Sequence, residues 1–160
     1  MTEATRSDGP RELSRADFPV LRRMNTRWGD NDHYGHLNNV VYYELFDTAV
    51  NGWLIDTCGD VRDLPAIGVV AETSCRYLSQ TSYPDVLHVG VGLDRRGRSS
   101  VVYRVAVFRE EPADDLGKVR VSDTPSAVGS FVHVYVDSQT RRPVPIPEIV
   151  AAALESITQR

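Results

Sequence analysis

The sequence lacks a long hydrophobic run, a surplus of positive charge and a cluster of cysteines. No apolar stretch approaches the roughly 20 residues that span a bilayer, and residues 1–20 lack the apolar core of a secretory signal. We therefore expect a cytoplasmic protein without a membrane partner. A net charge of −4 also argues against non-specific nucleic-acid binding, which needs a basic face.

Only two cysteines, Cys58 and Cys75, are present, and their spacing is not that of a metal-ligand motif. We expect two buried thiols, and the sequence alone leaves a disulfide between them open. A chain of 160 residues with 41% hydrophobic and 25% charged residues is typical of one globular domain with a substantial core.

Residues 1–18 are polar and show no periodicity, so we expect a flexible N-terminal arm ahead of a single domain over residues 19–160. A strand fits the start of that domain, and four later segments have the β-rich or alternating pattern of strands. A short helix is expected after three closely spaced prolines. The expected strands are 20–28, 69–79, 86–93, 100–108 and 127–137, and the expected C-terminal helix is 148–157.

The segment 39–58 has the pattern of a long helix that is apolar around most of its circumference. Its clearly polar side chains form one narrow stripe because they are spaced i, i+3 and i+7. These polar residues are Glu44, Asp47 and Asn51. Asn38 suits the N-cap and Gly59 the residue after the last turn, so the helix should be enclosed by the rest of the fold.

The order of strand, long helix and four strands predicts the α+β class, with a long helix packed on a curved antiparallel sheet of about five strands. Gly90 and Gly92 share one face of the 86–93 strand, where they suit bending or close approach of another backbone. A single helix covers only one face of a sheet. We therefore expect the other face or an edge to pair with a second copy, in a homodimer or homotetramer.

The densest group of chemically active side chains lies just ahead of that helix, in "RWGDNDHYGHLNNVVYYELFDTAV". One interpretation is a metal site, since Asp and His are ligand types. An EF-hand loop is disfavoured because Tyr34 and Val41 occupy two ligand positions. Zinc or iron bound by His33, His36 and one Asp stays open.

Two other interpretations need no metal. Asp30, His33 and Asn38 suit a structural role, because such residues cap helices and satisfy turns. Alternatively, a carboxylate faces a helix N-terminus, where free N–H groups polarise a carbonyl group. The carboxylate would then attack that carbonyl or activate water.

The stretch Arg27–Ala49 resembles the acyl-CoA thioesterases of the hotdog fold, in the branch similar to 4-hydroxybenzoyl-CoA thioesterase. The motif is an aromatic residue, an Asp-x-Asp-x-x-Gly turn, His-hydrophobic-Asn-Asn, and a long helix with an early tyrosine. The matching residues are Trp28, Asp30, Asp32, Gly35, His36, Leu37, Asn38, Asn39 and Tyr42. The order of elements extends the resemblance to residues 20–138.

The resemblance implies hydrolysis of acyl-CoA thioesters to free acid and coenzyme A, without a cofactor or a metal. Asp32 would be the base or nucleophile, and the backbone N–H of Asn39 would bind the thioester carbonyl oxygen. Gly35 would permit the turn that aims Asp32 and would bind substrate together with Tyr42, and His36 would support the turn. Two alternatives stay open: a hydratase or dehydratase using Asp32 with His36, and a non-catalytic acyl-CoA-binding protein.

Coenzyme A carries three phosphate groups, so its site needs local positive charge. The segment "DRRGRSS" (94–100) places Arg96 and Arg98 at an expected hairpin turn. Arginine suits bidentate contact with phosphate. We assign both residues to substrate binding, with an ordinary solvated turn as the alternative.

Overall fold

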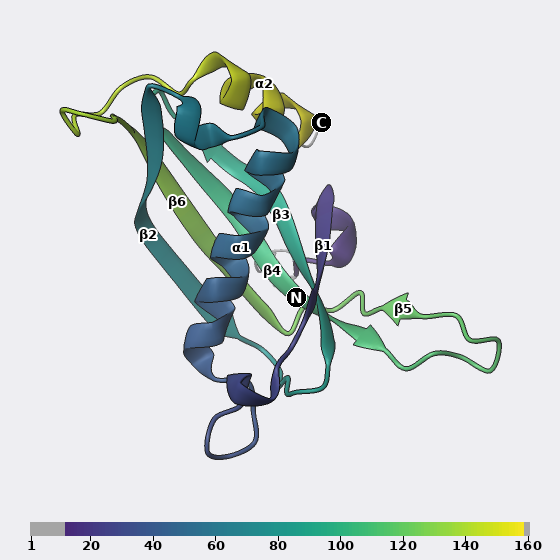
Figure 1. The fold of residues 1–160 in the computed structure, drawn as a ribbon. Coiled ribbons are helices and arrows are strands. Elements are labelled where there is room, and N and C mark those ends of the chain that lie inside the picture. Colours follow the sequence, from purple (N-terminus) through teal and green to yellow (C-terminus); the bar gives the residue numbers. More distant parts are fainter. Residues whose placement is uncertain (1–11, 159–160) are drawn as a thin grey trace, which may run out of the picture.

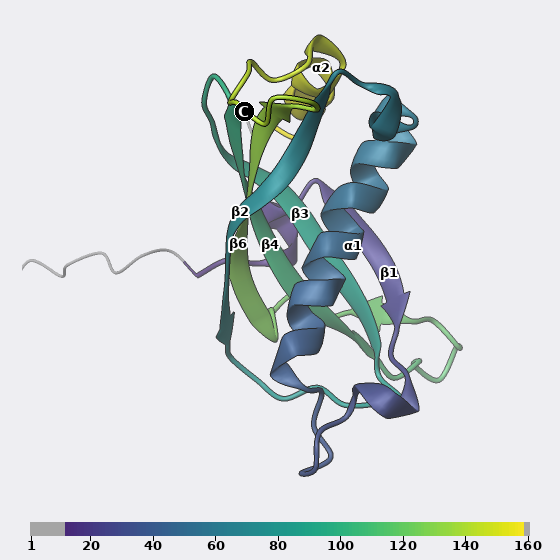
Figure 2. The ribbon, with the colours of Figure 1, turned by 60° about the vertical axis from the view of Figure 1, so that its left-hand side comes forward.

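The computed structural model describes residues 12–158. One long helix, α1 (Asn39–Cys58), lies across a curved antiparallel sheet (Figures 1 and 2). The sheet order is β1-β3-β4-β6-β2, with the short β5 paired to β4. The strands are β1 (Val20–Asn25), β2 (Ala66–Tyr77), β3 (Val86–Arg96), β4 (Ser100–Glu111), β5 (Arg120–Val121) and β6 (Ala127–Asp137); α2 (Glu148–Ser156) follows. The architecture expected from the sequence is confirmed.

The helix α1 begins and ends where its capping residues predict. Asn38 Oδ1 accepts a hydrogen bond of 3.2 Å from the Val40 N–H, and Gly59 closes the helix with φ of +76°. One face packs onto the sheet; its buried residues are Tyr42, Leu45, Phe46, Ala49, Val50, Trp53 and Leu54. The expected enclosure is incomplete, because the sheet covers one side and leaves Val40 and Ile55 60% and 53% exposed.

Several strand boundaries differ by two or three residues from the sequence prediction, and β3 and β4 each run three residues further than expected. β1 ends at Asn25, and residue 28, the expected end of the strand, instead begins a 3-10 helix (Trp28–Asp30). β2 begins earlier, at Ala66, and carries a bulge between Val70 and Glu72. Ala71 is the extra residue of that bulge and is exposed.

The outer face of the sheet is partly covered by the chain before β1. Phe18 is only 4% exposed and its ring packs edge-on against Phe108, with 5.5 Å between centroids. A Cβ added at Gly90 would lie 2.7 Å from the Phe18 ring, so glycine permits a close approach here, by a side chain rather than by the backbone that the sequence suggested. Phe18, which the sequence analysis places in the N-terminal arm, thus packs against the sheet. The flexibility expected of residues 1–11 lies outside the described residues.

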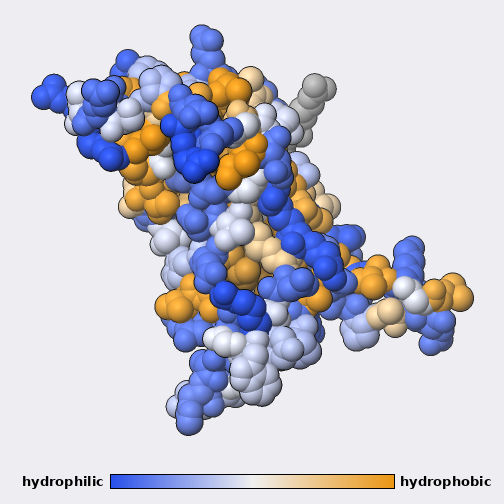
Figure 3. All heavy atoms as spheres, in the orientation of Figure 1, coloured by the Kyte–Doolittle hydropathy of each residue, from blue (hydrophilic) through white to orange (hydrophobic). Residues whose placement is uncertain are grey.

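Two features stand out at the surface. The β4–β5 hairpin projects from the body with apolar side chains near its end (Figure 3), and Leu116 there is 93% exposed. β2 is an edge strand whose Val69 and Val70 are 36% and 48% exposed. Within residues 12–158, no helix has the length and apolar character that a bilayer crossing requires.

Candidate functional site

The residues between β1 and α1 fold into a closed turn around Asp32. Its backbone N–H donates 2.7 Å to the His36 carbonyl, and its carbonyl accepts 3.1 Å from the Gly35 N–H. The carboxylate Oδ1 accepts from the backbone N–H groups of Tyr34 (2.8 Å) and His36 (3.1 Å). Gly35 has φ of +82°, a conformation that favours glycine. The turn therefore holds the Asp32 side chain in one orientation.

Asp30 stabilises this turn through hydrogen bonds to Arg27 on one side and to Asn38 on the other. Its buried carboxylate accepts from the Arg27 backbone N–H at 2.7 Å and from Arg27 Nε at 3.0 Å. Its backbone carbonyl accepts 2.8 Å from the Asn38 N–H, just before the helix. Asp30 and Asn38 thus have the structural roles that the sequence favoured for them.

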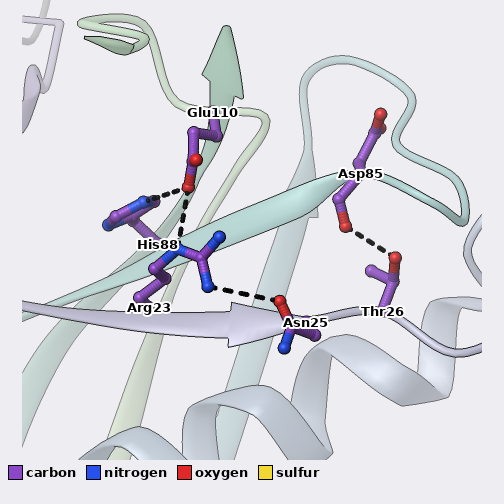
Figure 4. A network of polar contacts seen from close by, with 6 residues as sticks. All are labelled: Arg23, Asn25, Thr26, Asp85, His88 and Glu110. Carbon is purple, nitrogen blue, oxygen red and sulfur yellow. Dashed lines mark hydrogen bonds and ion pairs between the residues drawn. The ribbon is translucent and has the colours of Figure 1, made fainter. Parts of the chain in front are cut away.

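A polar network holds the end of β1, which leads into the turn (Figure 4). Glu110 Oε2 lies 2.9 Å from His88 Nε2 and accepts from Arg23 Nε at 3.1 Å. The hydrogen bond from His88, together with Arg23, lowers the pKa of Glu110. The Thr26 hydroxyl donates 2.6 Å to the Asp85 carbonyl. These contacts join β1 to β3 and β4 directly before the Asp32 turn.

A cavity of about 310 Å³ lies between the turn, the start of α1 and the chain that follows β2. Four of the residues expected in the site line it together, and segment 77–81 forms the opposite wall. The lining residues are Asp32, His36, Leu37, Asn39, Tyr42, Tyr77, Leu78, Ser79, Gln80 and Thr81. We call this cavity the Asp32 pocket.

Tyr77 and Thr81 are site residues that the sequence reasoning missed. The Tyr42 and Thr81 hydroxyls lie 2.7 Å apart, and the rings of Tyr42 and Tyr77 meet edge-on with 5.0 Å between centroids. The Tyr77 hydroxyl donates 3.0 Å to the Asn39 carbonyl. Burial raises the pKa of Tyr42, so this phenol stays protonated at neutral pH. The sequence carried one signal for Tyr77: it is a tyrosine near the end of an expected strand, just before a polar loop.

The first amide of α1 is available for a ligand. Asn39 is the first helical residue, so its N–H has no intrahelical acceptor, and the capping side chain of Asn38 accepts from Val40 instead. The positive end of the helix dipole lies at the same point. Asn39 and Asp32 both line the Asp32 pocket.

Arg96 and Arg98 do not join this pocket in the same chain. Arg96 Nη1 pairs with Glu155 in α2 at 2.9 Å, and the Arg98 carbonyl accepts 2.9 Å from Ile146. α2 lies by the last turn of α1, where Cys58 Sγ contacts the Ile149 carbonyl at 3.7 Å. A helix of 20 residues is about 30 Å long, so the two arginines lie at the opposite end of α1 from Asp32.

The metal alternative has no support from the geometry. The described part of the chain holds no group of three or more His, Cys, Asp or Glu side chains gathered as metal ligands. Asp32 and His36 interact through the His36 backbone N–H. Cys58 and Cys75 are both free and half-buried, which settles the question of a disulfide between them.

Comparison with known proteins matches residues 26–154 to the model of the thioesterase-like superfamily. The structure is similar to the PA5185 protein from Pseudomonas aeruginosa strain PAO1, with 37% identity, a TM-score of 0.80, and 93% of this chain and 98% of that chain covered. A thioesterase from Thermus thermophilus, complexed with coenzyme A and Zn, is 26% identical, with a TM-score of 0.70 and coverage of 90% and 97%. A mutant 4-hydroxybenzoyl-CoA thioesterase complexed with 4-hydroxybenzoyl-CoA is 20% identical, with a TM-score of 0.66 and coverage of 87% and 98%, which supports the fold alone. A comparison with curated proteins gives no match.

Proposed function

Because the chain belongs to the thioesterase-like superfamily, we propose that it hydrolyses acyl-CoA thioesters to a free acid and coenzyme A in the Asp32 pocket. The observation that carries this proposal is that Asp32 and Asn39, the first residue of α1, line one pocket. Thioester hydrolysis needs both an electron-pair donor and a stabiliser for the developing oxyanion.

In this mechanism the thioester carbonyl oxygen accepts a hydrogen bond from the Asn39 N–H, at the positive end of α1. Asp32 Oδ1 is held by two backbone amides, which leaves Oδ2 for the reaction. Oδ2 attacks the carbonyl carbon or removes a proton from the attacking water. The C–S bond then breaks and the thiolate leaves. If Asp32 acted as the base, it returns the water proton to the thiolate and the water oxygen stays in the free acid. If Asp32 attacked, water hydrolyses the resulting anhydride, which releases the acid, restores the Asp32 carboxylate and supplies the proton for the thiolate.

The hydratase alternative is less well supported. That chemistry would pair the Asp32 carboxylate with the His36 imidazole, whereas the contact between these residues runs through the His36 backbone N–H. His36 is therefore better placed to hold the turn than to transfer a proton.

The test is a hydrolysis assay over a panel of acyl-CoA substrates, with release of free thiol as the readout. Asp32→Asn should lower kcat by roughly 10²–10⁴-fold with little change in KM, because it removes the base and keeps the size. Asp115→Asn, in the exposed β4–β5 hairpin, is the matched control and should be unaffected. Wild-type turnover in Asp32→Asn would exclude this mechanism.

Single turnover in H₂¹⁸O separates the two forms of the mechanism. If Asp32 attacks the carbonyl, an anhydride forms and its hydrolysis can place ¹⁸O in the Asp32 carboxylate. If Asp32 acts as a base, the label enters only the acid product. Label found in the tryptic peptide that holds Asp32, measured by mass spectrometry, therefore establishes attack by Asp32.

We also propose that the working unit is a homodimer or homotetramer in the cytoplasm, with acyl-CoA as its partner. The exposed edge strand β2 supports this assembly, because unpaired backbone groups on an edge favour pairing with another strand. A second copy would also be needed to bring Arg96 and Arg98 near an Asp32 pocket, since they lie far from it within one chain.

A further inference from the structure

The connection between β2 and β3, residues 78–85, runs past the start of α1 (Figures 1 and 2). At its beginning, the backbone N–H groups of Leu78 and Ser79 both donate to the Ser126 carbonyl, at 2.8 and 3.0 Å. At its end, the Asp85 carbonyl accepts from the Thr26 hydroxyl at 2.6 Å. Ser126 directly precedes β6 and Thr26 directly follows β1. Both ends of the connection are therefore held beside the sheet, although it contains no helix or strand.

The middle of this connection holds both sides of the Asp32 turn. The Leu37 N–H donates 2.7 Å to the Thr81 carbonyl, and the Tyr83 N–H donates 2.9 Å to Asn31 Oδ1. Asn31 and Leu37 also pair with each other across the turn, as an isolated β-bridge. The residues that enter and leave the turn are thus both hydrogen-bonded to one short segment.

Thr81 contacts the helix as well. Its Oγ1 lies 2.7 Å from the hydroxyl of Tyr42, which is three residues after Asn39 in the first turn of α1. Thr81 and Tyr42 are only 2% and 3% exposed, so a hydroxyl that lost its partner here would be left unpaired. One residue thus holds the turn through its carbonyl and α1 through its hydroxyl. Those two elements carry Asp32 and the Asn39 N–H.

Packing alone does not explain a threonine at this place, because valine has nearly the same shape and no polar atom to bury. The hydroxyl matters for where the turn lies relative to the helix. A misplacement of about 1 Å between reacting groups can lower a rate by about 10²-fold. A typical domain stays folded after losing one such hydrogen bond. The effect of this contact on catalysis should therefore exceed its effect on folding.

We propose that Thr81 is a positioning residue: it joins the Asp32 turn to the start of α1 and so sets where Asp32 lies relative to the Asn39 N–H. Asn31, the residue between the two aspartates of the motif, supports it by holding the other side of the turn. The consequence for catalysis rests on the proposed function. Neither Thr81 nor Asn31 needs to touch the substrate.

The first experiment measures amide hydrogen exchange by NMR in the folded protein, which needs no turnover. Thr81→Val keeps the shape and removes Oγ1, so exchange of the Leu37 amide should become about 5–10-fold faster, the factor typical of one neutral hydrogen bond. Thr81→Ser keeps the hydroxyl and should restore slow exchange. Asn31→Ala should speed exchange of the Tyr83 amide by a similar factor. Thr124→Val, at an exposed residue, is the matched control and should change neither amide.

The second experiment measures hydrolysis of acyl-CoA. Thr81→Val should lower kcat by about 10–100-fold and change KM by less than about threefold, because the contact positions reacting groups and does not bind substrate. Thr81→Ser should recover most of the activity. In an Asp32→Asn background, Thr81→Val should cause little further loss, since a residue that acts through Asp32 then has no carboxylate to position. A change that only reduced the folded fraction would lower kcat by the same factor in both backgrounds.

Three results would overturn the proposal: an unchanged Leu37 exchange rate in Thr81→Val, a wild-type kcat in that variant, or equal losses in the two backgrounds. Absence of hydrolysis by the wild type is a different result. It would contradict the proposed function, and the exchange rates would then decide by themselves whether Thr81 holds the turn against α1.

Discussion

The Tyr77 hydroxyl donates a 3.0 Å hydrogen bond to the carbonyl oxygen of Asn39, which joins the last residue of β2 to the first residue of α1. The same residue of the helix carries the N–H proposed to hold the substrate carbonyl. The position of that N–H is thus set by a contact between residues that lie far apart in the sequence.

Tyr77→Phe should lower kcat by up to about 10-fold and leave the fold intact, because it removes one anchoring hydrogen bond and keeps the ring. Steady-state kinetics and circular dichroism measure the two effects. Tyr34→Phe, at a residue 83% exposed, is the control. A tenfold loss in that control as well would mean that Tyr77 has no special role in positioning the helix start.

Asn39→Pro tests the backbone donor itself. Proline is tolerated at the first helical position, where the N–H lacks an intrahelical partner, so the fold and the oligomer should persist. Losing one oxyanion donor typically lowers kcat by about 10²–10³-fold. Asn39→Ala keeps the N–H and should lose far less activity. Equal losses in both variants would assign the effect to the Asn39 side chain, and a fully active proline variant would place the donor elsewhere.

Replacing both Arg96 and Arg98 by Ala should raise KM for acyl-CoA, more at low salt than at high salt, because salt screens contacts with phosphate. Substrates on a short pantetheine thiol lack the nucleotide and should be nearly unaffected. Glu155→Ala, which frees Arg96 from its ion pair, controls for loss of the pair alone. Equal losses on both substrate types would show that the arginines act through folding.

His133 should give the folded protein a measurable pH dependence. Its pKa falls from 6.5 to about 4 through burial, so between these values the unfolded chain binds a proton that the folded protein does not. Stability should therefore fall as pH drops from 6.5 to 4, by roughly 3 kcal/mol relative to His133→Phe. Urea unfolding of both proteins at pH 7 and pH 4 measures it. Parallel losses in the two proteins would assign the acid sensitivity to other groups.

Light scattering at micromolar concentration should report a dimer or tetramer of the 17.9 kDa chain. Val70→Lys places a charge on the exposed edge strand β2 and should shift the protein toward monomer, because edge charges oppose strand pairing. Lys118→Ala, a charge change in the exposed β4–β5 hairpin, should leave the mass unchanged. An active wild-type monomer would contradict the proposed assembly.

Local features of the sequence determined the elements of this protein well. The limits of α1 depend on Asn38, Gly59 and the apolar spacing between them, all within one segment, so they were predicted to the residue. The turn ahead of α1 closes on its own backbone. Its motif therefore brought Asp32, His36, Asn39 and Tyr42 to one expected site, and the structure places all four around one pocket.

Only the tertiary structure decided which distant segments meet. Thr81 and Tyr77 reach the Asp32 pocket because β2 ends beside the start of α1, and Phe18 joins the domain by packing above Gly90. Arg96 lies at the other end of α1, where it pairs with Glu155. Periodicity reports which face of an element is buried but not which element covers it. Long-range pairing of strands, which costs chain entropy and is stabilised by burial, settles that second question.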